Sequence, residues 1–60
     1  MTMLIKMGSN IITTITNPTF VPRIGELVGF KVSPSQTELR RVRDVEYVFD
    51  GNTVVIFISI

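Results

Sequence analysis

The stretch that decides the fold is Asp50–Ile60, whose sequence is DGNTVVIFISI. It begins with Asp-Gly, a dipeptide that supplies the positive φ angles of a tight turn between two antiparallel strands. Four aliphatic residues after the turn alternate along the chain and so share one face: Val54, Ile56, Ile58 and Ile60. The other face is also apolar at its middle, at Val55 and Phe57. A strand with two apolar faces is predicted to be central in a sheet or to form an interface.

Short runs of β-forming residues, separated by turn residues, fill the rest of the chain. Gly8-Ser9-Asn10 is a turn signal of the kind that joins two strands. Asn17-Pro18 ends a strand, because Pro cannot donate a ladder hydrogen bond. Gly29 interrupts another run, and we expect a bend or a bulge there. The pattern predicts five strands, over residues 1–7, 11–16 and 26–32, within the stretch 38–50, and over residues 52–60.

The stretch 38–50 supports two interpretations. Ser35 and Glu38 have the spacing of a capping box, and the apolar residues that follow recur at roughly helical spacing. Against a helix, apolar residues alternate from Val45 to Phe49, and β-branched and aromatic residues are frequent there. We favour a strand with a bulge near residues 43–44, which leaves room for a single helical turn near residues 35–38, and a helix is the alternative.

Residues 1–60 are therefore expected to form a single small all-β domain. Five short strands in so short a chain favour a five-stranded SH3-like barrel. The alternative is a curled antiparallel sheet, which a second subunit could complete.

The side chains that carry most enzyme chemistry are missing. The chain has no Cys and no His, which removes disulfides, thiolate metal sites and the usual base for a Ser or Thr nucleophile. Asp44 and Glu46 share a strand face, but no pocket-forming motif accompanies them, so we expect a solvated pair. We therefore predict no catalytic residues, no metal site and no cofactor.

Apolar residues are in excess for a body with so little interior. They make up 45% of the 60 residues. Small domains without disulfides or metals often gain burial by association, so a homo-oligomer is expected. The candidate interface residues are Val55 and Phe57, which lie opposite the aliphatic face, and the adaptable side chains of Met3 and Met7. For the two methionines, ordinary core packing is an equal alternative.

The main charge feature is Arg40-Arg41-x-Arg43. On one strand, Arg41 and Arg43 would share a face and Tyr47 would follow them, with Lys31 as a candidate neighbour. Small β barrels bind single-stranded nucleic acid through such basic, aromatic surfaces. The neighbouring acids and the net charge of +1 favour a simpler role, in which the arginines solubilise the sheet. These five residues are the candidate contacts to nucleic acid or to a partner, with nucleic acid as the less favoured ligand.

Nothing in the sequence indicates a membrane or export segment. The longest apolar run is residues 54–58, far short of the roughly 20 residues that a membrane helix needs. The segment 1–7 has no basic lead followed by a long apolar stretch, as a signal peptide would. We expect a cytoplasmic protein.

The segment Phe20–Val28, FVPRIGELV, resembles the V-P-R-x-G-E-x-V opening of small SH3-like proteins of bacteriophages and bacteria. In those proteins a V-x-x-V-x-Y/F strand and a final aliphatic strand follow, and residues 42–47 and 54–58 fill these places here. The resemblance implies an SH3-like barrel and a phage origin, and it implies no activity. The resulting hypothesis is a non-enzymatic protein-interaction module. One version of it is a phage-encoded inhibitor or accessory factor acting in the host cytoplasm on a bacterial protein. The alternatives are a nucleic-acid-binding barrel and a structural subunit of a larger assembly.

Overall fold

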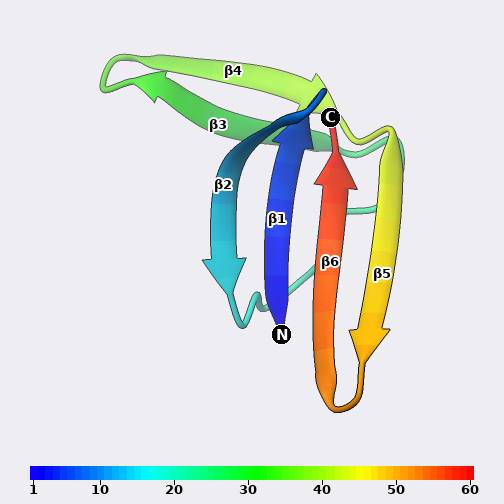
Figure 1. The fold of residues 1–60 in the computed structure, drawn as a ribbon. Helices are drawn as coiled ribbons and strands as arrows, with labels where there is room; N and C mark the ends of the chain where they lie inside the picture. The colour runs from blue at the N-terminus through cyan, green and yellow to red at the C-terminus, as the bar shows by residue number, and fades with distance from the viewer.

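A computed structural model describes residues 1–60 as six strands without a helix (Figure 1). The strands are β1 (Thr2–Met7), β2 (Asn10–Thr16), β3 (Leu27–Ser33), β4 (Gln36–Arg41), β5 (Asp44–Asp50) and β6 (Thr53–Ser59). They form a four-stranded sheet in the order β2-β1-β6-β5 and a separate two-stranded sheet of β3 and β4. The all-β prediction is confirmed. The prediction of five strands in a closed barrel is corrected, because there are six strands and the two sheets do not close on each other.

Two hairpins build the four-stranded sheet. In the β5–β6 hairpin, Asp50 pairs with Thr53 and leaves Gly51-Asn52 as a two-residue turn. Gly51 has a φ of 59°, and Asn52 has no positive φ, which is the pattern of a type II′ turn with Gly in first place. The β1–β2 hairpin has an equivalent turn at residues 8–9. The turn at residues 8–9 lies within the predicted Gly8-Ser9-Asn10, and the last turn lies one residue later than the predicted Asp50-Gly51.

The centre of this sheet is a parallel pair, β1 with β6. Met3 lies beside Ile56, and Ile5 beside Ile58. The pairing continues past β6, where Ile60 donates its backbone N–H to the Lys6 carbonyl at 2.9 Å. The two ends of the chain therefore run side by side, and the double apolar face of β6 follows from its central position.

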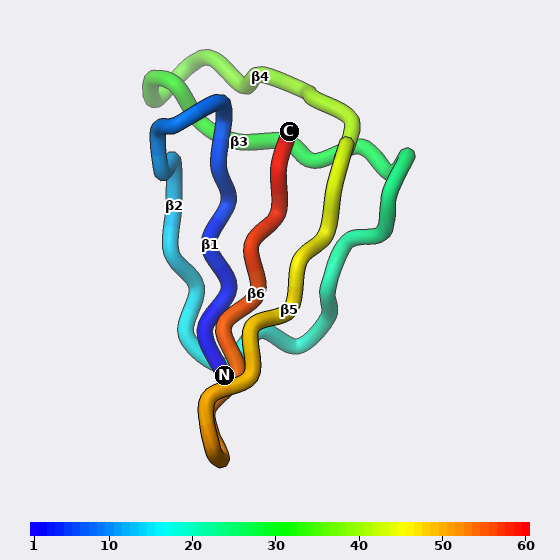
Figure 2. Tube along the Cα trace, turned by 45° about the vertical axis from the view of Figure 1, so that its right-hand side comes forward, coloured from blue at the N-terminus to red at the C-terminus, as the bar shows by residue number.

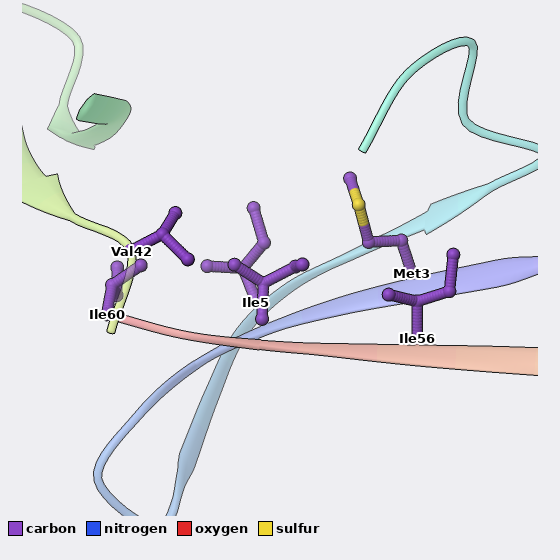
Figure 3. Packing of buried hydrophobic residues seen from close by; sticks show 6 residues of the cluster. Met3, Ile5, Val42, Ile56 and Ile60 are labelled. Atoms are coloured by element: carbon purple, nitrogen blue, oxygen red, sulfur yellow. The ribbon is translucent and has the colours of Figure 1, made fainter. Parts of the chain in front are cut away.

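The core occupies one face of the four-stranded sheet (Figure 3). Its six buried hydrophobic residues are Met3, Ile5, Val42, Ile56, Ile58 and Ile60. Figure 2 shows the chain after β2, here called the crossing segment (residues 17–26), running from the end of β2 to the far side of the sheet near β5. Val21 of this segment packs against the core, and Pro22 is buried.

The strand that was not predicted is β4, which overlaps the start of the stretch 38–50 that supports both a helix and a strand. Residues 36–41 pair antiparallel with β3, so the helical alternative is wrong. No bulge forms at Gly29 or near residue 43. A Cβ on Gly29 would lie 3.0 Å from Cδ2 of Leu39, so glycine makes room for this cross-strand side chain. The strand ends at Arg41, and Val42 and Arg43 turn the chain into the other sheet.

The two-stranded sheet of β3 and β4, here called the arm, projects from one end of the four-stranded sheet (Figure 1). Val42 connects it to the rest of the molecule. The Val42 carbonyl accepts a hydrogen bond from Gly25 at 2.9 Å, and the Val42 N–H donates to Glu26 at 2.9 Å. With the arm, the molecule measures 40 × 23 × 22 Å and is distinctly elongated.

Candidate interaction face

The candidate site follows from the strand register. Laterally paired residues project to the same side of a sheet, and neighbours along a strand project to opposite sides. Because Met3 and Ile5 point into the core, Leu4 points away from it. Its partner on β6 is Phe57, and Val55 lies one step along the same face. Val48 of β5 pairs with Val55 and completes the group.

We call this side of the four-stranded sheet the outer face, and its apolar centre is Leu4, Val48, Val55 and Phe57. In Figure 1 the crossing segment passes behind the sheet, and the side toward the viewer has no chain in front of it. Leu4, Val55 and Phe57 are half-buried by their lateral neighbours alone, and Val48 is 43% exposed. The outer face is thus a flat apolar surface that no element of the chain covers.

Charged side chains surround this centre asymmetrically. Nζ of Lys6 lies 5.4 Å from the centroid of the Phe57 ring, within the range of a cation–π contact. On the opposite border, β5 places Glu46 beside Phe57 and Asp44 beside Ser59. No ion pair joins Lys6 to either acid. The β5 border of the outer face is therefore acidic.

The structure separates the four candidate interface residues. Val55 and Phe57 lie on the outer face, as the alternation of β6 predicts. Met3 is only 3% exposed and belongs to the core, so it is not available to a partner. Met7 is half-buried and packs against the core. Leu4 and Val48 had not been predicted, because they join the site only through pairing between strands that are distant in sequence.

The three candidate arginines, Arg40, Arg41 and Arg43, do not lie along one strand. Arg40 and Arg41 are neighbours on β4 and project to opposite sides of the arm. Nε of Arg40 donates to Oε2 of Glu38 at 2.9 Å, and NH1 of Arg41 donates to the Gly25 carbonyl at 2.8 Å. Arg43 lies beyond the end of β4, so the single strand that would align it with Arg41 does not form.

The other two candidate contact residues, Lys31 and Tyr47, also lie apart from the arginines in the fold. Lys31 pairs with Thr37 near the tip of the arm. Tyr47 lies on β5, on the side of the sheet that carries the core, and its ring stacks on Phe49 at a centroid distance of 6.4 Å. The five residues therefore make no continuous basic and aromatic groove.

A hollow of about 570 Å³ lies on the core side, between the four-stranded sheet, the crossing segment and the arm. It is lined by Met3, Ile5, Ile15, Phe20, Pro22, Glu26, Leu27, Val28, Gly29 and Arg41. Its two charged side chains are already engaged. Oε1 of Glu26 accepts the backbone N–H of Arg23 at 2.6 Å, and Arg41 bonds Gly25. The hollow therefore presents an apolar wall with few free polar groups.

Comparison with known proteins found no matching family, no similar curated protein and no similar solved structure. The structure contains no helix that is long and apolar enough to cross a membrane.

Proposed function

We propose that this chain is a small non-enzymatic protein-interaction module that works as a homo-oligomer and binds another protein through its outer face. The observation that carries the proposal is the uncovered apolar centre formed by Leu4, Val48, Val55 and Phe57. Contiguous apolar surface of this kind marks interaction sites on soluble proteins. The aromatic ring of Phe57 at its middle is the type of side chain that dominates binding energy at interfaces.

The total exposed surface supports association. The chain exposes 4415 Å². A compact monomer of this mass is expected to expose about 3,900 Å², so about 500 Å² more is in contact with water than globular packing requires. The elongated shape and the exposed apolar residues of the arm account for this excess. Association with a second molecule is the usual way in which so small a domain gains the missing burial.

The charge on the outer face indicates the chemistry of the partner. Because Asp44 and Glu46 line the β5 border, the complementary surface has an apolar centre with basic residues beside it. The resemblance of residues 20–28 to bacteriophage proteins is what favours a bacterial host protein as this partner, bound in the host cytoplasm. An inhibitor or accessory role is the corresponding biological hypothesis.

Phe57→Gln tests this proposal against a matched control, Phe49→Gln. Both residues are phenylalanines of the β5–β6 hairpin, but Phe49 is 72% exposed on the side of the sheet opposite the outer face. Tagged versions of the wild type and the two variants are used to capture proteins from nuclease-treated bacterial lysate. The masses of the captured complexes are then measured by native mass spectrometry. Binding of each purified captured protein to the wild type and the two variants is measured afterwards.

The expected result is one host protein retained stoichiometrically by the wild type and by Phe49→Gln, with at least tenfold weaker binding to Phe57→Gln. Equal binding to all three proteins would contradict the role of the outer face. Loss of all captured material after nuclease treatment would instead support nucleic-acid binding. Large assemblies of this chain alone would support a structural subunit.

A further inference from the structure

One free sheet edge differs from the others in its chemistry. The four-stranded sheet ends at β2 and at β5, and both strands of the arm are also edges. Natural proteins protect such edges with charged side chains, because unpaired backbone groups invite another strand. The strands β3, β4 and β5 all contain charged residues, whereas Asn10–Thr16, NIITTIT, contains none. Of the four edge strands, β2 alone carries no charged side chain, and its one irregularity is a register shift at Ile12 in its pairing with β1.

The backbone of β2 has donors aimed outward. Asn17 donates its N–H to the Met1 carbonyl at 2.7 Å, which fixes the phase of the β1–β2 ladder. In an antiparallel ladder, residues that bond to the neighbouring strand alternate with residues whose N–H and C=O groups point away from it. By this alternation Ile15 and Thr13 face β1, and Thr14 and Thr16 present their peptide groups to the free edge. No other backbone segment bonds there.

The identity of the occupant follows from comparing the two edges of the same sheet. Two copies of β5 paired antiparallel about Tyr47 would place Asp44 opposite Asp50 of the second copy, and like charges in that position repel. Two copies of β2 paired about Thr14 bring together only uncharged, β-branched residues. Thr14 lies opposite Thr14 of the second copy, and Thr13 opposite Ile15, which are favourable cross-strand neighbours. The β2 edge is thus complementary to itself.

We propose that two copies of this chain associate by antiparallel pairing of their β2 edges, which joins their four-stranded sheets into one continuous sheet. This inference rests on the proposed homo-oligomer and identifies its contact. The two-fold axis lies perpendicular to the sheet at Thr14 and gives a closed dimer. The outer faces of both copies then lie on the same side of the joined sheet and can engage a partner with two adjacent sites.

The position of the arm agrees with this arrangement. The arm extends beyond β2 at the end of the sheet where β2 begins (Figure 1). The arm leaves most of the β2 edge uncovered, and the second copy would lie next to the arm.

Thr14→Pro is the variant that tests the pairing, with Thr14→Ala as its control. Proline removes the outward N–H without removing a bond to β1, whereas alanine removes only the side chain. Dimerisation is measured by sedimentation and native mass spectrometry, and folding by circular dichroism. The expected result is that Thr14→Ala dimerises like the wild type and that the dissociation constant of Thr14→Pro rises at least tenfold, because both copies lose a donor. Unchanged dimerisation of a folded Thr14→Pro would overturn the proposal.

Hydrogen exchange of the wild-type protein decides the matter if Thr14→Pro does not fold. In a concentrated sample the amides of Thr14 and Thr16 are expected to exchange slowly and to lose protection on dilution. The amide of Tyr47, which faces outward on β5 by the same alternation, exchanges fast at every concentration. An oligomer in which Thr14 exchanges as fast as Tyr47 would overturn β2 pairing yet leave the proposed function standing. Weakened partner binding by Phe57→Gln is measured separately, so the two proposals fail on different observations.

Discussion

Leu4 of β1 and Phe57 of β6 lie side by side in a parallel pair, fifty-three residues apart in the sequence, on the face of the sheet that the chain leaves uncovered. Their neighbours Ile5 and Ile58 form the equivalent pair on the other side and are buried in the core. One sheet thus separates the interior of the molecule from its proposed binding surface. Substitutions at adjacent positions of β6 should accordingly affect different properties.

Ile56→Ala and Val55→Ala provide the first test of this division. Ile56 has an exposed fraction of 0%, and its truncation is expected to cost about 2–5 kcal/mol of unfolding free energy. A core this small rarely supplies more than about 3–5 kcal/mol, so the variant should be largely unfolded. Val55→Ala on the outer face should cost about 1 kcal/mol. Urea unfolding followed by circular dichroism measures both, and equal losses would contradict the assignment of the faces.

The β5–β6 turn provides a second test. Gly51 has a φ of 59°, a region in which side chains other than glycine are strained, while Asn52 beside it has an ordinary φ. Gly51→Ala is expected to lower the free energy of unfolding by roughly 1–2 kcal/mol. Asn52→Ala should change it by less than about 0.5 kcal/mol. Thermal unfolding of the two variants makes the comparison, and a larger loss for Asn52→Ala would show a different turn geometry.

Local patterns predicted much of this fold. The Asp50-Gly51 dipeptide fixed the last hairpin, and the two apolar faces of residues 53–59 indicated a central strand. Both signals lie within a few residues of the structure that they determine. The same alternation placed Val55 and Phe57 opposite the aliphatic face, where the structure has them.

Features that depend on distant contacts were not predictable in this way. The strand Gln36–Arg41 contains Glu38, Arg40 and Arg41 and lacks an apolar alternation, so only its pairing with β3 makes it a strand. The β1–β6 pairing joins the two ends of the chain, and no local pattern encodes its register. For this reason local patterns do not decide between an interface and the core for Met3, which belongs to the core, and they give no sign of Leu4.

The separation of Arg40 and Arg41 from Arg43 leads to a third prediction. Arg40 bonds Glu38 and Arg41 bonds Gly25, so few free cationic groups converge on one surface. We expect only weak binding of a single-stranded oligonucleotide at low salt and no detectable binding at physiological salt. Fluorescence anisotropy of a labelled oligonucleotide measures this. Tight binding whose affinity falls steeply with salt would restore the nucleic-acid hypothesis if Arg43→Ala made this salt dependence weaker. Each phosphate contact contributes to the dependence of affinity on salt.

The junction between the arm and the four-stranded sheet gives the last prediction. Val42 is 2% exposed, and both its N–H and its carbonyl bond to the chain just before β3. Val42→Ala is expected to cost roughly 2 kcal/mol of unfolding free energy, because it removes two buried methyl groups and leaves a cavity. Val32→Ala is the matched control, since Val32 is exposed on the arm and its truncation should have little effect.

Hydrogen exchange shows where the loss at Val42 occurs. A two-stranded hairpin is at best marginally stable alone in water, so the arm depends on its attachment at Val42. Amides of β3 and β4 should therefore exchange faster in Val42→Ala under conditions in which the amides of β1 and β6 remain protected. Uniform acceleration across all six strands would mean that the arm and the sheet unfold as one unit. The faster exchange of the arm alone would show that the molecule is a stable sheet with a separately opening arm.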